Sequence, residues 1–274
     1  MTAIFDSAIS RERCLEFRKR ILEISQTVSA LHIASAYSCM EIVETIFFSL
    51  MRRGDDKTKS IDTFVMSKGH GCLAQYVALE KLGILDPIHL KNYCKPGGIL
   101  GTHPDYGNPG IEASTGSLGH GLTLATGIAY ANKIRKQDGD VYAVMSDGEL
   151  QEGSSWEAML IASSLRVTNL IGFIDLNDFQ SLGRTSELHP TFYPVGEKIA
   201  AFGWEVIELD NGHDSAAIHE AVTNRSKNKP MMVVCRTTKG KGVSFMENVP
   251  IWHYRAPNAE EYKIALKELE GKVS

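Results

Sequence analysis

Three apolar runs in the second half of the chain are continuous rather than alternating in polarity. They are DVYAVMS (140–146), NLIGFIDL (169–176) and MMVVCRT (231–237). Strands of a parallel sheet are buried on both faces, and such strands read as unbroken apolar runs. We therefore expect three parallel strands here, and a shorter strand over 62–66 that leads into SKGHG.

Stretches with helical spacing of apolar residues separate these strands. They cover 73–82, 117–132, 154–165 and 215–226. A strand-then-helix rhythm predicts an α/β fold, with a doubly wound, mostly parallel sheet and helices on both faces. Ligands of such sheets bind at the carboxyl ends of the strands.

The two ends of the chain also have helical character. Residues from about 10 to 53 read as helices joined by a loop that contains His32, and 258–274 reads as a charged terminal helix. A Gly/Pro-rich irregular segment covers 95–116. We expect a single domain over 1–274, with a helical N-terminal segment over about 1–56.

Composition narrows the classes of function. The 29 Lys and Arg residues against 33 Asp and Glu residues give a net charge of −4, without the basic field that nucleic acid or an anionic membrane would require. Five cysteines without a C-x-x-C pair argue against a disulfide framework and a thiolate zinc site. The first residues are charged where a signal peptide is apolar, and no run is long enough to span a membrane. We expect a soluble, cytoplasmic protein.

Candidate metal ligands follow two of the predicted strands. SDGELQEG (146–153) follows one strand and precedes a helix, and DLND ends the next strand. Asp147 would supply a carboxylate oxygen, Asn177 an amide oxygen and Phe179 a backbone carbonyl, a set that suits Mg²⁺ or Ca²⁺ bridging a diphosphate. Gly148 lets backbone N–H groups approach the phosphate oxygens, and the helix that follows adds its dipole. Taken alone, a D-G pair is more often a tight turn with a solvated aspartate.

The spaced D-G and N after consecutive buried strands resemble the thiamine-diphosphate signature of the transketolase family. The resemblance runs from about His32 to about Pro257 and includes further motifs. It implies that His70 in SKGHG reaches the diphosphate, and that Gly116 and Leu118 in EASTGSLGHGL lie against the aminopyrimidine. Each motif also has a plain structural interpretation, as a loop histidine or as the entry to a helix.

The resemblance also implies substrate-facing histidines: His32 in LHIASAYSCMEI, His103 in GTHPD, and His253 in PIWHYRAP. Ketol transfer moves a two-carbon unit from a ketose to an aldehyde, and it needs groups that take and return protons of sugar hydroxyls. Neutral imidazoles suit this near pH 7. We expect His253 and His32 to handle these protons, and His253 also to contact the cofactor. Glu152 matches a glutamate that reaches across the subunit interface.

Several positions depart from the family pattern. Ile33 and Ala34 replace proline and glycine after the first histidine, and Tyr254 replaces glycine after the last. Larger side chains at these positions would narrow the substrate channel, or favour an unusual ketose or a less polar acceptor. Ser146 replaces the leading glycine of the D-G motif. Lys239 and Lys241 in TTKGKGV could help the diphosphate electrostatically, but lysines spaced by glycine in a loop are usually solvated, and we do not assign them to the site.

A full transketolase continues into a pyrimidine-binding domain, which supplies the glutamate that activates the cofactor. The resemblance therefore implies a complementary C-terminal subunit, an α2β2 assembly, and sugar phosphate substrates. Three alternatives remain open: specialised ketol transfer or acyloin synthesis, the α subunit of a 2-oxo acid dehydrogenase, and a non-catalytic homologue. SKGHG, STGSLG and the W-H pair argue against the dehydrogenase.

Overall fold

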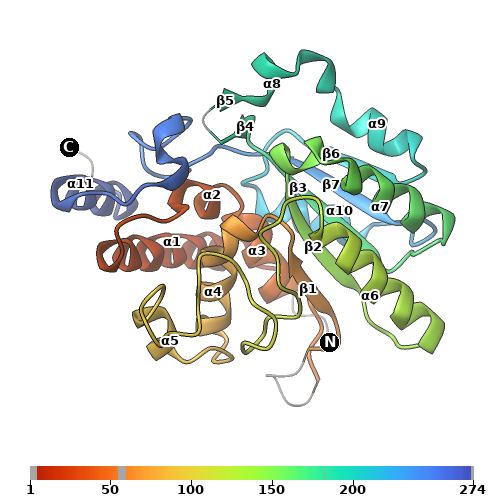
Figure 1. Ribbon diagram of the computed structural model, residues 1–274, viewed down its shortest axis with the longest axis horizontal. Coiled ribbons are helices and arrows are strands. Elements are labelled where there is room, and N and C mark those ends of the chain that lie inside the picture. Colours follow the sequence, from red (N-terminus) through yellow and green to blue (C-terminus); the bar gives the residue numbers. More distant parts are fainter. Residues whose placement is uncertain (1–4, 55–59, 182, 273–274) are drawn as a thin grey trace.

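A parallel sheet of five strands forms the frame of the molecule. The computed structural model describes residues 5–54, 60–181 and 183–272. The strands are β1 (Thr63–Met66), β2 (Val141–Ser146), β3 (Leu170–Leu176), β6 (Glu205–Leu209) and β7 (Met231–Arg236). Their order is β1-β2-β3-β7-β6, and every neighbouring pair is parallel. The doubly wound parallel sheet predicted from the sequence is confirmed (Figure 1).

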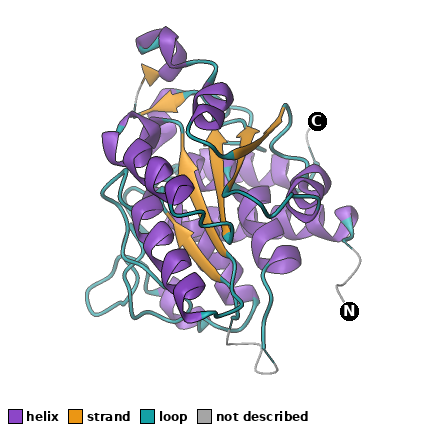
Figure 2. Ribbon diagram, turned by 90° about the vertical axis from the view of Figure 1, so that its right-hand side faces the viewer, coloured by secondary structure: helices purple, strands orange, loops and turns teal. Residues whose placement is uncertain are grey.

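Alternate side chains of the central strands enter two separate cores. Tyr142 and Val144 of β2 belong to one core, whereas Val141, Ala143 and Met145 belong to the other. Because both faces are buried, the sequences of the central strands are apolar except near their carboxyl ends. Figure 2 shows the sheet between helices on its two sides.

The two helical layers come from different parts of the chain: one from residues before 82 and after 214, and the other from residues 121–201. One layer contains α1 (Ser7–Ile24), α2 (Ile33–Ser38), α3 (Met40–Thr45), a π-helical turn (Ile46–Leu50), α4 (Cys72–Lys81), α10 (Ser215–Thr223) and α11 (Ala259–Leu269). The other contains α6 (Gly121–Arg135), α7 (Gly153–Ser164) and α9 (Val195–Ala201).

The order of the strands reverses next to β3. The chain passes from β1 through β2 to β3, continues to the edge strand β6, and returns to β7 beside β3. A reversal of this kind opens a crevice at the carboxyl ends of the strands, where ligands of doubly wound folds bind. The short hairpin of β4 (Phe179–Gln180) and β5 (Gly183–Arg184) lies beyond this edge, with α8 (Thr185–Leu188).

Strand β6 and helix α9 were not predicted. The sequence of β6, EVIEL, mixes charged and apolar residues, and all five residues keep some exposure at the edge of the sheet. The strand β6 therefore lacks the continuous apolar run by which the three central strands were found. The short α5 (Pro87–Lys91) was also missed, whereas no helix or strand occurs within the predicted irregular segment 95–116.

Helix ends differ from prediction where turns intervene. Helix α6 begins at Gly121 rather than 117, because Gly119 has a φ of 85° and residues 117–120 form a turn. The N-terminal helices end at Leu50, and α11 ends at Leu269. The parts of these two predictions that fall on 1–4, 55–56 and 273–274 lie outside the described residues. Among the residues that the structure covers, no helix has the length and apolarity to cross a membrane.

Candidate functional site

A pocket of about 510 Å³ opens at the carboxyl edge of the sheet. Asp147 and Asn177 are buried beside it: Asp147 directly precedes the lining residue Gly148, and Asn177 lies two residues before the lining residue Phe179. The structure thus gathers residues that are far apart in the sequence. The predicted site residues that line the pocket are His32, His70, His103, Gly116, Leu118, Gly148, Glu152, Phe179 and His253.

Asp147 is a buried carboxylate with one oxygen left open. Its Oδ1 accepts a hydrogen bond of 2.9 Å from the backbone N–H of Gly148, and its Oδ2 has no partner within the described part of the chain. Burial, with the nearby Asp175 carboxylate, raises the pKa of Asp147 to about 7. A buried carboxylate oxygen without a partner is costly, and a bound cation would offset this cost. Asp147 therefore fits the predicted metal site.

Asn177 presents an amide oxygen on the neighbouring strand end. Its Oδ1 accepts a hydrogen bond of 3.1 Å from the backbone N–H of Phe179. The carboxyl ends of β2 and β3 pair in register, with Ser146 opposite Asp175. Asp147 and Asn177 follow these ends, and a carboxylate with an amide oxygen is a ligand set that Mg²⁺ accepts.

The histidines predicted from three distant motifs form one cluster with His70. The ring centroid of His32 lies 5.4 Å from that of His70, 6.0 Å from that of His103 and 5.4 Å from that of His253. Burial, followed by the neighbouring His253 and His103, lowers the pKa of His32 to about 3. Burial and Lys239 lower the pKa of His253 to about 4. Both rings are therefore neutral at physiological pH, so each has one ring nitrogen that donates a hydrogen bond and one that accepts.

Lys239 joins this cluster, and the expectation that it is a solvated loop lysine is wrong. It is 1% exposed, and its Nζ lies 2.8 Å from Nδ1 of His253. Burial lowers the pKa of Lys239 to about 8, so that it is still mostly protonated near pH 7. An ammonium group only donates, so Nδ1 of His253 accepts and the proton of the neutral ring stays on Nε2. Lys241, in contrast, is partly exposed and pairs with Glu247 at 3.4 Å.

The loop that contains Gly116 fits closely against two other parts of the site. Gly116 has a φ of 132°, and a Cβ atom there would lie 2.8 Å from the ring of His103. A Cβ on Gly69 would lie 2.6 Å from the backbone nitrogen of Gly116. The loops that contain His70, His103 and Leu118 can therefore meet only because these two positions lack side chains.

Glu149 is a second buried acid of the D-G motif, which the sequence did not single out. It accepts hydrogen bonds from Ser67 Oγ at 2.5 Å and from the backbone N–H of Gly119 at 2.9 Å. It thereby ties three loops of the site together. Glu152 is exposed at the rim of the pocket, directly before α7.

The departures from the family pattern have different structural consequences. Ile33 and Ala34 are completely buried in the core and do not line the pocket, so the expectation that they narrow it is wrong. Tyr254 is 51% exposed, and its ring centroid lies 4.6 Å from that of His32. The hydroxyl of Ser146 accepts a hydrogen bond of 3.3 Å from the N–H of Glu149, so serine fits the turn.

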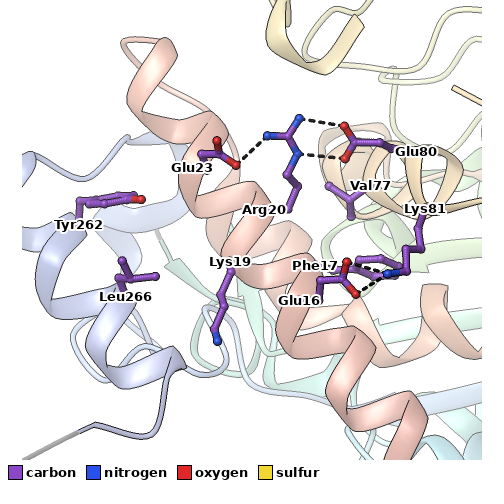
Figure 3. Close-up of a pocket in the computed structure, with 10 residues that line it drawn as sticks. All are labelled: Glu16, Phe17, Lys19, Arg20, Glu23, Val77, Glu80, Lys81, Tyr262 and Leu266. Carbon is purple, nitrogen blue, oxygen red and sulfur yellow. Dashed lines mark hydrogen bonds and ion pairs between the residues drawn. The ribbon is translucent and has the colours of Figure 1, made fainter. Parts of the chain in front are cut away.

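A larger hollow of about 610 Å³ lies elsewhere, between α1, α4 and α11 (Figure 3). Four of its charged side chains are already paired: Arg20 with Glu80 at 2.8 Å, and Lys81 with Glu16 at 2.8 Å. None of the predicted site residues lines it. The pocket at the sheet edge, with its open carboxylate oxygen and histidine cluster, is therefore the candidate site.

Known proteins are similar to this chain over almost its whole length. The family model described as "Transketolase, thiamine diphosphate binding domain" matches residues 12–270. A subunit of the apulose-4-phosphate transketolase of Phocaeicola vulgatus is 38% identical, over 93% of this chain and 92% of that protein. A 6-deoxy-6-sulfo-D-fructose transketolase subunit of a Clostridium species is 36% identical, over 92% of this chain and 93% of that protein.

A solved structure extends the similarity to the fold. The transketolase from Leishmania mexicana superposes with a TM-score of 0.87 at 28% identity, over 95% of this chain. The match covers 41% of that transketolase. The chain thus matches nearly the whole length of the two subunits, but less than half of the longer enzyme.

Proposed function

The chain belongs to the transketolase family, and we therefore propose that it is the diphosphate-binding subunit of a split transketolase that depends on thiamine diphosphate and Mg²⁺. The enzyme would transfer a two-carbon ketol unit from a ketose phosphate to an aldose acceptor. The observation that supports this most is one pocket that combines a histidine cluster with the adjacent open carboxylate oxygen of Asp147.

The residues of the pocket fit the cofactor and its metal. Asp147, Asn177 and the backbone carbonyl of Phe179 would hold Mg²⁺, with Ca²⁺ as an alternative. His70, the N–H of Gly148 and the N-terminus of α7 would face the diphosphate. When bound, thiamine diphosphate supplies the electron sink for cleavage of the carbon–carbon bond.

Gly116 and Leu118 would contact the aminopyrimidine of the cofactor. Both line the pocket, and Gly116 has no side chain to hold a flat ring away from the backbone. The loop is fixed from behind by Glu149, which accepts the N–H of Gly119. A rigid loop of this kind would hold the ring at a set distance from the histidine cluster.

The histidines divide the proton transfers between them. His32 is neutral, and its buried Nδ1 has no partner among the described residues, so it would accept a hydrogen bond from a sugar hydroxyl. His253 keeps its proton on Nε2 because Lys239 donates to Nδ1, so it would donate a hydrogen bond to a substrate oxygen. His103 would orient the C1 hydroxyl of the donor.

Two features support a separate partner protein that carries the pyrimidine-binding domain, and we propose an α2β2 assembly of the two, as the family resemblance implies. Similar proteins of nearly the same extent are named as subunits. Helices α6 and α7 pack side by side and expose the apolar side chains Leu124, Leu160 and Ile161, which are 43%, 55% and 48% exposed. A partner that covers this face would also approach Glu152 at the rim of the pocket.

A specialised donor is the second candidate. Tyr254 lies beside His32 where the family pattern has glycine, and similar proteins are named for apulose 4-phosphate and 6-deoxy-6-sulfofructose.

We place the enzyme in the cytoplasm, because its five cysteines are free thiols and four of them are buried.

Ketol transfer from xylulose 5-phosphate to ribose 5-phosphate tests the proposal. The chain would be assayed alone and mixed with its candidate partner subunit, with thiamine diphosphate and Mg²⁺. Turnover only in the mixture would support a split transketolase, whereas turnover by the chain alone would contradict it. Turnover with apulose 4-phosphate but not with xylulose 5-phosphate would favour the specialised donor.

A further inference from the structure

Asp175, near the end of β3, is a completely buried carboxylate at the centre of the site's polar network. It forms an ion pair with Lys68, which follows β1. It also accepts hydrogen bonds from Ser38 Oγ of α2 at 2.5 Å, from Thr237 Oγ1 after β7, and from Asn177 Nδ2 at 3.1 Å. One side chain therefore connects four segments that surround the pocket.

The contact with Asn177 decides which way its amide faces. A carboxylate only accepts hydrogen bonds, so the amide must turn its NH₂ group towards Asp175. The amide oxygen then points to the other side, where it accepts the N–H of Phe179 at 3.1 Å. The backbone carbonyl of Asp175 also accepts the N–H of Asp147 at 3.4 Å. Asp175 thus contacts both side-chain ligands of the proposed metal site.

We propose that Asp175 is a positioning residue, which fixes the amide of Asn177 so that its oxygen is presented to the divalent cation. This inference rests on the metal site of the proposed function and adds a residue to it. Residues that orient metal ligands from behind are often nearly as important for affinity as the ligands.

The hydrogen bonds distinguish Asp175 from a ligand. Its Oδ1 accepts from Thr237, and its Oδ2 accepts from Lys68, Ser38 and Asn177. Asp147 Oδ2, in contrast, has no partner among the described residues. Asp175 therefore accepts hydrogen bonds at both of its oxygens, whereas Asp147 has one oxygen free for a cation.

A double substitution separates positioning from folding. Removing Asp175 alone would leave Lys68 as an unpaired buried charge, which is strongly destabilising. Replacing both members, as Lys68→Met with Asp175→Leu, removes the charges and the acceptor together, and apolar replacements of a buried pair are often tolerated. The matched control is Arg52→Met with Asp62→Leu. Asp62 is a buried acid paired with Arg52 at 2.6 Å, and it lies before β1, at the end of the strands opposite to the site.

The first measurement needs no metal. Solvent exchange of the side-chain amide protons of Asn177 would be followed by NMR in the full chain labelled with ¹⁵N-asparagine, with Asn177→Asp to assign the signal. We expect exchange at least about tenfold faster in Lys68→Met/Asp175→Leu than in the wild type, and unchanged in the control pair. Unchanged exchange in the first variant would overturn the inference.

The second measurement is the Mg²⁺ concentration that half-saturates binding of thiamine diphosphate to the assembled complex. We expect it to rise about 10- to 100-fold in Lys68→Met/Asp175→Leu and to stay within about twofold in the control pair. Equal shifts in both pairs would reduce Asp175 to a structural role. If Asp147→Asn also left the Mg²⁺ requirement unchanged, the proposed metal site itself would fail, whereas the amide exchange would still decide the orientation of Asn177.

Discussion

Single residues in the site differ in chemistry mainly because they differ in burial. Lys239 and Lys241 are two residues apart in TTKGKGV, yet one is buried against His253 and the other pairs with Glu247 near the surface. The sequence predicted the histidines, Asp147 and Asn177 as site residues, because each lies in a recognisable motif. It could not separate the two lysines or identify Asp175, because their roles depend on contacts between loops that are distant in the chain.

Lys239→Met tests the role of this lysine directly. Without the ammonium group, Nδ1 of His253 is no longer held as an acceptor, and the ring can exchange between its two neutral tautomers. We expect kcat to fall at least about tenfold, and the ¹⁵N signals of His253 to lose their Nε2–H pattern. Lys241→Met should change neither by more than about twofold, and equal losses in the two variants would contradict the role given to Lys239.

At the scale of elements, the helical layer on one side is tied to the loop that contains Lys239. Glu41 of α3 forms an ion pair with Arg18 of α1 at 2.6 Å and accepts a hydrogen bond of 2.8 Å from His213. Nε2 of His213 accepts the N–H of Thr238 at 2.8 Å. The packing of α1 against α3 thus supports the backbone that places Lys239.

The pKa of Glu41 predicts how this support depends on pH. Burial alone would raise this pKa, but Arg18 and His213 outweigh burial and lower it to about 2. A carboxylate with a lowered pKa stabilises the fold fully above its unfolded pKa of about 4.3, and this contribution is lost as the pH falls towards 2. The shift corresponds to about 3 kcal/mol.

Urea unfolding of Glu41→Gln checks this account. Near neutral pH we expect a loss of about 3 kcal/mol in the free energy of unfolding, and a smaller difference from the wild type at about pH 3. Glu16→Gln is the control, because Glu16 is half-exposed and its ion pair with Lys81 should contribute under about 1 kcal/mol. A difference for Glu41→Gln that stays the same at both pH values would contradict the lowered pKa.

Continuous apolar runs predict some strands of the sheet and miss others. The central strands β2, β3 and β7 were predicted to within about one residue because burial on both faces makes their sequences continuously apolar. The edge strand β6 was missed because its sequence is mixed in polarity. The position of the site followed from topology, since ligands bind where parallel strands end.

At the scale of the whole molecule, the proposed assembly depends on the exposed face of α6 and α7. Leu160→Asp places a charge at the most exposed of the three apolar side chains of this face, and burying it against a partner would be costly. We expect the affinity for the partner subunit to fall at least about tenfold, measured by light scattering over a range of concentrations. Ile88→Asp changes a residue of similar exposure (47%) on α5, and it should leave assembly intact. An intact assembly in Leu160→Asp would place the interface elsewhere.

The most direct test of the proposed site is binding of thiamine diphosphate to the assembled complex, with and without Mg²⁺, in wild type, Asp147→Asn and Asp178→Asn. Asp178 is the matched acid: it follows Asn177 but turns away, towards Arg184 at 3.0 Å and the N–H of Ser186 at 2.8 Å. We predict Mg²⁺-dependent binding that is weakened at least about tenfold by Asp147→Asn and retained in Asp178→Asn. Binding that does not depend on Mg²⁺, or that is unchanged in Asp147→Asn, would contradict the account.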